Sequence, residues 1–77
     1  MEELLLAIAR GLVDDPAAVT VTQDEPREDG TIVFHLRVAA DDMGRVIGRE
    51  GKIAKSIRTV MRAQAARENK RVIVDIL

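Results

Sequence analysis

The sequence predicts an α+β fold in which a three-stranded sheet is covered on one face by helices. Apolar residues recur at helical spacing in two long segments, apolar and polar residues alternate in three short ones, and glycines or prolines separate these segments. The 77 residues leave room for one domain, and a hydrophobic content of 47% is sufficient for a core. We therefore expect a single domain over residues 1–77, and a chain this small often gains stability by pairing.

The N-terminal half is predicted to form one helix and two strands. Residues 2–13 carry Leu, Ile and Ala at helical spacing, and this helix ends at Asp14-Asp15-Pro16 because proline disfavours helical geometry in the residue before it. Residues 18–22 alternate as a strand, and residues 23–30 form a turn or hairpin loop. Residues 31–38 give the clearest strand. One of its faces holds Ile32, Phe34, Leu36 and Val38, and the other holds Thr31, His35 and Arg37.

The C-terminal half is predicted to form two helices and a last strand. Asp41 or Asp42 can cap a short helix that runs to about residue 47. After the interruption at residues 48–51, a longer helix spans residues 52–67, and residues 71–76 alternate as a strand. The inward stripe of the long helix is expected to hold Ile53, Ile57, Val60, Met61 and Ala65. The resulting order is α-β-β-α-α-β.

The composition disfavours catalysis and metal binding. The chain has no cysteine and a single histidine, His35, which we interpret as an ordinary surface residue of its strand. The adjacent carboxylates Asp14/Asp15 and Asp41/Asp42 are better explained as helix-end signals than as acid–base pairs. We therefore expect no metal, no cofactor and no enzymatic activity.

The sequence also indicates a cytoplasmic protein that does not insert into membranes. No apolar run approaches the roughly 20 residues that a membrane-spanning helix needs. The start, Met1-Glu2-Glu3, is acidic where a signal peptide would be basic.

The formal net charge of −1 hides a strong segregation of charge along the chain. Residues 43–71 contain nine Lys or Arg and two Glu, a net charge of +7, and the remaining residues contain three Arg and eleven Asp or Glu, a net charge of −8. Such segregation can create a positive surface that attracts nucleic acid. Solvation of a helix face by Lys and Arg explains the charge equally well, so the charge alone does not decide the function.

The most informative segment is the loop Gly48-Arg49-Glu50-Gly51 between the two C-terminal helices. Gly48 lies where the first helix must stop, and a left-handed C-cap is easiest for glycine. Gly51 lies where the next helix begins, and we expect its missing side chain to let another backbone approach closely. The unpaired N–H groups at the start of that helix favour a phosphate.

Basic residues surround this loop. Arg49, Lys52 and Lys55 can add charge-assisted contacts to phosphate oxygens. On the long helix Lys52, Lys55, Thr59 and Arg62 form one stripe at helical spacing. These features predict a phosphate cradle with a basic flank, and a purely structural turn between two helices remains the alternative.

Other glycine-loop motifs fit less well. A Walker loop needs Gly at position 46 and Ser or Thr at position 53, where this chain has Val46 and Ile53. The dinucleotide-binding GxGxxG pattern is absent. An RRM needs stacking aromatic residues on its sheet, and Phe34 is the only aromatic residue of the chain.

The loop and its flanks resemble the signature of KH domains, and the element order resembles the type II, bacterial arrangement. The matching residues are Ile47-Gly48-Arg49-Glu50-Gly51-Lys52, preceded by Asp42-Met43-Gly44 and followed by Ile53-Ala54-Lys55-Ser56-Ile57-Arg58. The whole chain resembles the small stand-alone bacterial KH proteins called KhpA. Further support comes from Asp29-Gly30-Thr31, Leu36-Arg37-Val38-Ala39 and Ala66-Arg67-Glu68-Asn69-Lys70-Arg71-Val72.

The resemblance implies an RNA-binding protein, an RNA chaperone or post-transcriptional regulator, that holds the backbone of single-stranded RNA without catalysis. A KH domain clamps about four nucleotides, with the bases over an apolar groove. The candidate RNA-binding residues are the loop residues Gly48, Arg49, Glu50 and Gly51, the basic residues Arg45, Lys52 and Lys55, and the groove candidates Val46, Ile47 and Ile53. Glu50 departs mildly from the pattern, because a carboxylate repels phosphate.

The resemblance also implies partners. Proteins of this kind pair as homodimers and with a larger KH protein called KhpB, Jag or EloR, in RNA metabolism linked to cell-envelope growth and division. A rival interpretation is therefore a protein-interaction or dimerisation module with little RNA binding of its own. The residues alone do not distinguish RNA from single-stranded DNA, because backbone contacts do not read the 2′-hydroxyl.

Overall fold

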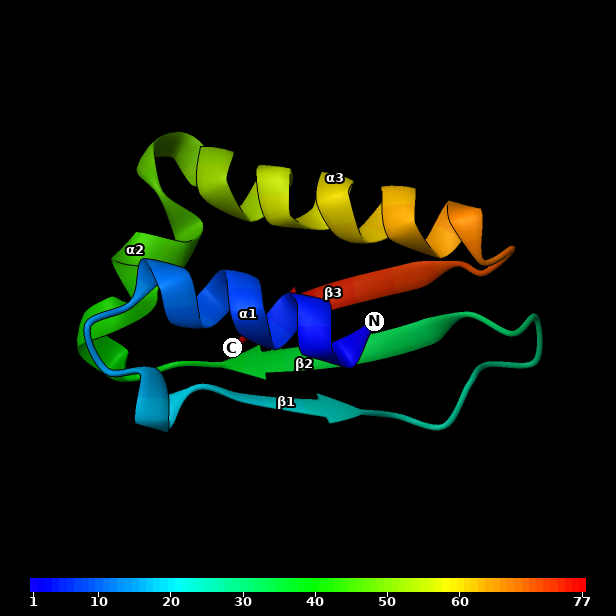
Figure 1. Cartoon of the computed structure of the whole chain (residues 1–77), viewed down its shortest axis with the longest axis horizontal. Helices are drawn as coiled ribbons and strands as arrows, with labels where there is room; N and C mark the ends of the chain where they lie inside the picture. Colours follow the sequence, from blue (N-terminus) through cyan, green and yellow to red (C-terminus); the bar gives the residue numbers. More distant parts are fainter.

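The computed structural model describes residues 1–77 and contains three helices, three strands and three short 3₁₀ turns (Figure 1). The helices are α1 (Glu2–Leu12), α2 (Met43–Ile47) and α3 (Lys52–Arg67), and the strands are β1 (Thr20–Gln23), β2 (Ile32–Arg37) and β3 (Val72–Ile76). The 3₁₀ turns are η1 (Pro16–Ala18), η2 (Ala40–Asp42) and η3 (Arg49–Gly51). The predicted order of helices and strands is confirmed.

The three strands form one mixed sheet in the order β1-β2-β3. β1 pairs antiparallel with β2, where Val21 lies opposite Leu36, and β3 pairs parallel with β2, where Val74 lies opposite Phe34. A hairpin loop is sufficient for the antiparallel pair, whereas a parallel pair needs a crossover. Here α2 and α3 supply that crossover, so the glycine loop lies within the connection that closes the sheet.

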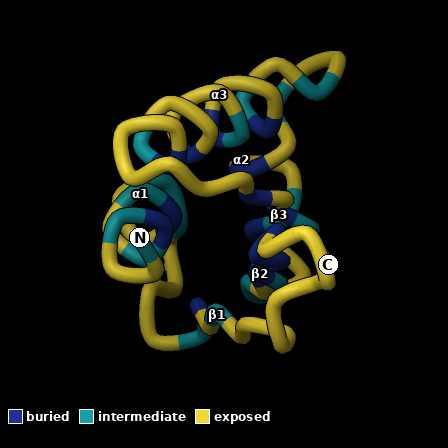
Figure 2. Tube along the Cα trace, turned by 90° about the vertical axis from the view of Figure 1, so that its right-hand side faces the viewer, coloured by how far each residue is buried: buried dark blue, intermediate teal, exposed yellow.

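The helices lie on one face of the sheet, and the core lies between the two layers (Figures 1 and 2). The largest fully buried side chains are Phe34, Leu5, Leu36, Met61 and Val46, which come from the sheet and from all three helices. The α+β class, with a sheet covered on one face, is therefore confirmed.

The buried face of α3 differs from the predicted stripe at Val60, and Ile53 is only half-buried. Ile57, Met61 and Ala65 are buried as predicted, but Val60 is 45% exposed. Successive helical residues are about 100° apart, so a helix that buries Met61 turns its neighbour Val60 outward. The small residue Ala54 completes the buried row instead. None of the helices, α3 included, is long and apolar enough to cross a bilayer.

The first strand begins two residues later than predicted. Pro16–Ala18 forms a 3₁₀ turn, in which the N–H of Ala18 donates to the carbonyl of Asp15 at 3.2 Å, and β1 starts only at Thr20. The fixed φ of proline suits the first position of a helical turn. The residues after Pro16 therefore continue as a turn before the chain extends.

Asp42 links two distant segments instead of capping a helix. Neither Asp41 nor Asp42 makes a side-chain capping bond, so the predicted cap is wrong. The carboxylate of Asp42 is buried, and it accepts the backbone N–H groups of Asp14 at 3.1 Å and Asp15 at 3.0 Å. Asp42 therefore holds the chain that leaves α1 against the start of α2.

We expect Asp42→Ala to lower the free energy of unfolding by about 2–4 kcal/mol, because two backbone donors lose their charged acceptor. Urea denaturation measures this change. The matched control is Asp41→Ala, which removes an exposed neighbouring carboxylate and should change stability by no more than about 0.5 kcal/mol. Equal effects of the two substitutions would contradict the bridging role of Asp42.

His35 joins the three strands on the open face of the sheet. Its Nδ1 lies 3.1 Å from Oδ2 of Asp75, in β3, and its Nε2 lies 2.9 Å from Oδ2 of Asp24, which follows β1. A neutral imidazole carries one N–H donor, whereas the imidazolium can donate to both carboxylates. Hydrogen bonding to Asp24, and then to Asp75, therefore raises the pKa of His35 above its ordinary value of 6.5. The interpretation of His35 as an ordinary surface residue missed this structural role.

The raised pKa makes stability depend on pH. A group whose pKa is higher in the folded state stabilises the fold fully below its ordinary pKa, and this stabilisation disappears as the pH rises through the raised value. We therefore expect the melting temperature to fall as the pH rises above the ordinary pKa of 6.5, and His35→Gln to remove this part of the decline. Differential scanning calorimetry measures the melting temperature of both proteins as a function of pH. If the two curves run parallel, His35 does not cause the decline.

Candidate nucleic-acid interface

The glycine loop lies at one end of the molecule, where α2 ends and α3 begins (Figure 1). α2 stops after Ile47, and the N–H of Gly48 donates to the carbonyl of Gly44 at 2.9 Å. A single 3₁₀ turn, Arg49–Gly51, then reverses the chain into α3. The loop therefore projects from the junction of two helices.

Three of the four loop residues have positive φ. Gly48 has φ 75° and ψ 175°, Glu50 has φ 58° and ψ 23°, and Gly51 has φ 73° and ψ 15°. Glu50 and Gly51 are thus left-handed in succession, which costs about 1 kcal/mol for a residue with a side chain. The conformation of Gly48 lies outside the left-handed helical region, in a part of φ/ψ space open almost only to glycine. The prediction of a left-handed cap at Gly48 is therefore correct for the sign of φ but wrong for ψ.

A close approach was predicted at Gly51, but the structure shows it at Gly48. A Cβ at Gly51 would meet nothing within 4 Å, so no close approach occurs there. A Cβ at Gly48 would lie 2.6 Å from Cγ1 of Ile53, because the first turn of α3 folds the Ile53 side chain back over Gly48. Gly48 is thus needed for both its conformation and its size, and Gly51 for its conformation alone.

The basic candidates fall into two groups. Arg49, Lys52 and Lys55 are exposed, and none of them forms an ion pair. Arg45 is also exposed, but its guanidinium pairs with Asp14 at 2.9 Å and lies 3.5 Å from Asp42. The first three cations are therefore available to a ligand, whereas Arg45 is already neutralised.

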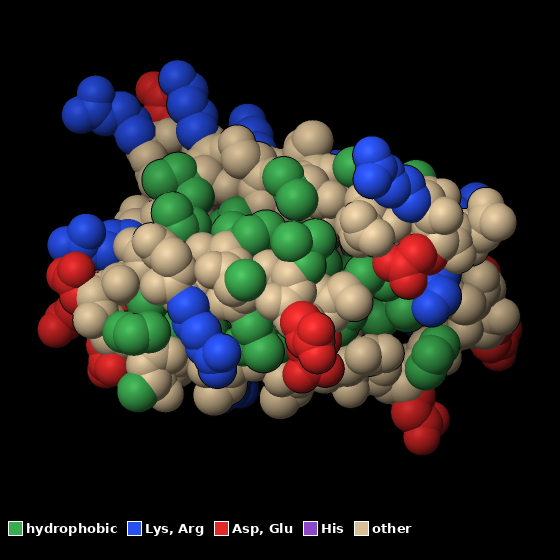
Figure 3. Space-filling view, in the orientation of Figure 1, with side chains coloured by type: hydrophobic (Ala, Val, Ile, Leu, Met, Phe, Trp, Pro, Cys, Tyr) green, Lys and Arg blue, Asp and Glu red, His purple; other side chains and the backbone are tan.

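Figure 3 shows Lys and Arg side chains projecting from the corner of the molecule at which the glycine loop lies, with an acidic side chain among them. Lys52, Lys55, Thr59 and Arg62 are all exposed, so the predicted stripe on α3 faces solvent. No side chain caps the N-terminus of α3. The positive end of the helix dipole and the stripe thus favour anions at the same place.

The three apolar candidates do not share one environment. Val46 has no exposed surface and belongs to the core, so its predicted role in lining a groove is wrong. It lies on the buried face of α2, in the core cluster that also contains residues of α1, α3 and the sheet. Ile47 is 39% exposed, and Ile53 is half-buried against the core. Only Ile47 and Ile53 present apolar surface beside the loop.

Two further groups of residues were missed from the sequence. The Nε of Arg58 donates to the carbonyl of Val74 at 3.1 Å and thereby ties α3 to the edge strand. A second group of basic side chains, Arg27, Arg62 and Arg71, gathers around a pocket towards the other end of α3. The adjacent basic residues Lys70 and Arg71 before the last strand could have indicated this group from the sequence. Arg27 lies more than 40 residues earlier, so no local pattern links it to them.

A family model described as KhpA/KhpB, KH domain, matches residues 2–76. The chain belongs to this family. A protein of Clostridium acetobutylicum named RNA-binding protein KhpA is 51% identical over 77 residues, which cover 100% of both chains. A protein of Treponema pallidum with the same name is 46% identical over 76 residues, which cover 99% of this chain and 92% of that protein. The resemblance of the whole chain to KhpA is therefore confirmed.

Solved structures show the same fold in another protein. A crystal structure of Era in complex with MgGDPNP and nucleotides 1506–1542 of 16S ribosomal RNA superimposes with a TM-score of 0.69 at 19% identity. The match covers 96% of this KhpA/KhpB-family chain but only 28% of the Era chain. An Era structure from Aquifex aeolicus gives a TM-score of 0.66 at 18% identity. The fold is thus a type II KH domain, as predicted.

Replacement of Gly48 and Gly51 by alanine should destabilise the protein to different degrees, because Gly48 is constrained in conformation and size and Gly51 in conformation alone. We expect Gly48→Ala to destabilise the protein by about 3 kcal/mol or more, and Gly51→Ala by about 1 kcal/mol. Chemical denaturation of the purified variants measures both values. The control is Gly44→Ala, in α2, where a Cβ meets nothing within 4 Å and alanine should stabilise the helix by up to about 1 kcal/mol.

The contact with Ile53 can be tested separately. Gly48→Ala should cost less in an Ile53→Ala background, because the colliding atoms are then absent and only the strained φ remains. The same loss in both backgrounds would show that the collision with Ile53 contributes nothing.

Proposed function

We propose that this protein binds single-stranded RNA by holding the phosphate backbone at the Gly48–Gly51 loop. The main support is the position of three unpaired, exposed cations, Arg49, Lys52 and Lys55, at the junction of two helices in a KH fold. The names of the relatives, RNA-binding protein KhpA, agree with this proposal.

Each residue has a separate part in the proposed site. Gly48 and Gly51 give the loop its shape, so that a phosphate can approach the backbone and the positive end of α3. Arg49 and Lys52 contact phosphate oxygens, and Lys55 extends the contact by one turn. Glu50 repels phosphate, and this repulsion limits the affinity of the single site.

The remaining candidates contribute indirectly or through apolar contact. Ile47 and Ile53 contact the bases of the bound strand, because both present apolar surface next to the loop. Arg45 holds α2 against the chain after α1 through its pair with Asp14. A site made of charge and aliphatic contact has little means of reading bases, which suits a sequence-tolerant RNA chaperone or post-transcriptional regulator.

Dimerisation belongs to the same proposal. Val60 is 45% exposed on α3, so this helix keeps apolar surface that a second KH domain can cover. We propose a homodimer, and a heterodimer with a KhpB/Jag/EloR-like protein, as the assembled forms. The same observation favours the rival function, a dimerisation module without RNA affinity of its own. Sedimentation with and without RNA separates the two, since the rival assembles but shows no shift with RNA.

The loop is tested by the double substitution Arg49→Asp, Glu50→Asp, which removes the loop cation and keeps the carboxylate. Aspartate tolerates positive φ better than glutamate, so the fold should persist. We expect the affinity for single-stranded RNA to fall by about tenfold or more, measured by fluorescence anisotropy. The control is Arg10→Glu on α1, which makes the same change in net charge at a site away from the loop. Equal affinity of the wild type and the loop variant at physiological salt would rule out the loop as the site.

The salt dependence of the same titration counts the phosphate contacts. Three to four contacts imply a slope of log affinity against log salt of about −2 to −3 on a single strand. The loop variant should show a shallower slope, because the cation at position 49 no longer releases a counterion. A flat response of the wild type would remove the electrostatic basis of the proposal.

A further inference from the structure

Glu50 is unfavourable at its place in the loop for two separate reasons. It is one of two non-glycine residues with positive φ, and its backbone is left-handed, at φ 58° and ψ 23°. Glycine adopts this conformation at a lower cost. Its carboxylate also lies in the loop where the proposed function places a phosphate, and like charges repel. A loop that only holds a phosphate needs neither cost, so the carboxylate points to a further contact.

The backbone of the loop holds Glu50 in a fixed place. The N–H of Gly51 donates to the carbonyl of Gly48 at 3.2 Å, and the N–H of Lys52 donates to the carbonyl of Arg49. These two hydrogen bonds close the turn around Glu50. The residue is exposed, so its side chain lies in solvent beside any ligand that the loop binds.

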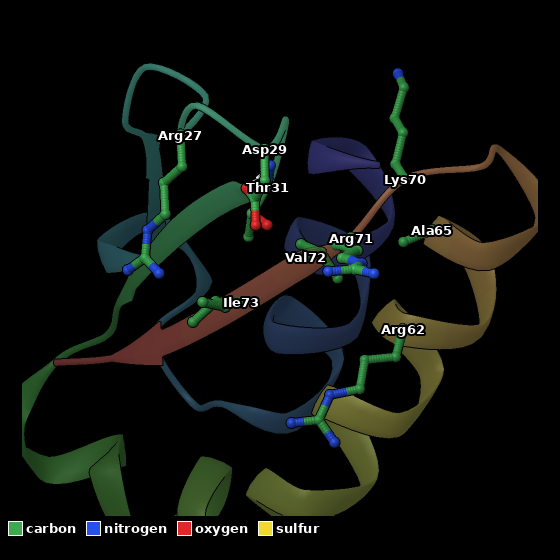
Figure 4. A pocket seen from close by; sticks show the side chains of 9 residues that line it. All are labelled: Arg27, Asp29, Thr31, Arg62, Ala65, Lys70, Arg71, Val72 and Ile73. Carbon is green, nitrogen blue, oxygen red and sulfur yellow. Dashed lines mark hydrogen bonds between the residues drawn. The ribbon is translucent and has the colours of Figure 1, made fainter.

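The carboxylate of Glu50 has no partner within the protein. It forms no ion pair, although Arg49 and Lys52 are close to it in the sequence, and it accepts no hydrogen bond. Asp29, which lines a pocket towards the other end of α3, shows the contrast (Figure 4). It accepts the backbone N–H of Thr31 at 2.9 Å, and hydrogen bonding with Thr31 holds the pKa of Asp29 below its ordinary value. Glu50 is therefore an acceptor that remains free for a ligand.

Three kinds of ligand group can bind a free carboxylate: a divalent cation, a base amine and a hydroxyl. A divalent cation is disfavoured, because the loop already presents three exposed cations without ion pairs. A base amine is disfavoured, because in the proposed site the bases lie on the apolar surface of Ile47 and Ile53. The ribose 2′-hydroxyl remains, and in RNA it lies next to the phosphate. A hydroxyl that donates to a carboxylate forms a strong, charge-assisted hydrogen bond.

We propose that the carboxylate of Glu50 accepts a hydrogen bond from a ribose 2′-hydroxyl of the strand held at the glycine loop, and thereby discriminates RNA from single-stranded DNA. This inference rests on the proposed function. With RNA, the hydrogen bond offsets the repulsion between the carboxylate and the phosphate. DNA has no 2′-hydroxyl, so it meets the same repulsion without this compensation.

The test compares two strands that differ only at the 2′ position. Oligouridylate and oligodeoxyuridylate of equal length are titrated against the wild type and Glu50→Ala, which removes the acceptor. We expect the ratio of RNA affinity to DNA affinity to fall about threefold to tenfold in Glu50→Ala. The affinity for DNA itself should rise, because the repulsion is gone. The matched control is Glu25→Ala, which removes the same charge from the loop between β1 and β2 and should keep the ratio of the wild type.

A third strand separates the hydroxyl from the shape of the sugar. A 2′-fluoro oligouridylate keeps the sugar conformation of RNA but has no O–H donor. It should bind the wild type more weakly than oligouridylate does, and this difference should shrink in Glu50→Ala. Each comparison uses two ligands on the same protein, so a loss of stability in a variant does not change the ratio. Circular dichroism melts establish that the variants fold.

The outcomes separate this inference from the proposed function. If Glu50→Ala raises the affinities for RNA and DNA by the same factor, the carboxylate only repels phosphate. This result overturns the contact with the 2′-hydroxyl and leaves the loop as the RNA site. Equal binding of the 2′-fluoro strand and oligouridylate by the wild type overturns the contact in the same way. Normal RNA binding by Arg49→Asp, Glu50→Asp overturns the proposed function, and this inference with it.

Discussion

The packing of Ile53 on the backbone of Gly48 determines how α3 leaves the loop, and most of the structure depends on α3. A Cβ at Gly48 would lie 2.6 Å from the Ile53 side chain, and the backbone at Gly48 adopts a conformation that few other residues allow. The tight reversal places Ala54 and Ile57 against the core within two turns of the loop. The same geometry closes the crossover between β2 and β3 and exposes the loop.

One face of α3 packs against the core, and the opposite face is exposed to solvent. Its buried row consists of small and aliphatic side chains, and Arg58 adds a hydrogen bond to the backbone of β3. The remaining basic residues of the helix form no ion pairs, because most of the acidic residues lie elsewhere in the chain. The exception among the basic residues near the loop is Arg45, which meets Asp14 and Asp42 at the end of α1. The segregation of charge in the sequence thus becomes a segregation in space.

Local patterns predicted the elements well, since a helical or alternating period depends only on near neighbours. The glycine loop was also predictable, because a break between two amphipathic segments needs residues that tolerate positive φ. The separate roles of Gly48 and Gly51 were not, because they depend on where Ile53 comes to lie.

Contacts between distant segments account for the other differences. The carboxylate of Asp42 accepts backbone N–H groups 27 and 28 residues earlier in the chain. Its position just before a helix therefore suggested a cap that does not form. Val46 has the same apolar character as Ile47, and only the packing of α2 shows that one is buried and the other exposed. Likewise Arg27 and Arg71 become neighbours of one pocket through the pairing of β2 with β3, which no local period reveals.

The position of Glu50 bears on the strength of the proposed RNA site. Glu50 is exposed between Arg49 and Gly51, so in the proposed RNA site its carboxylate would weaken a contact between this loop and a phosphate. In the proposed dimer, a second loop adds to this contact without a large entropic cost, because a strand held by one domain is already concentrated at the other. Weak backbone contacts at two proposed sites would let a strand bind without readout of its base sequence and exchange readily.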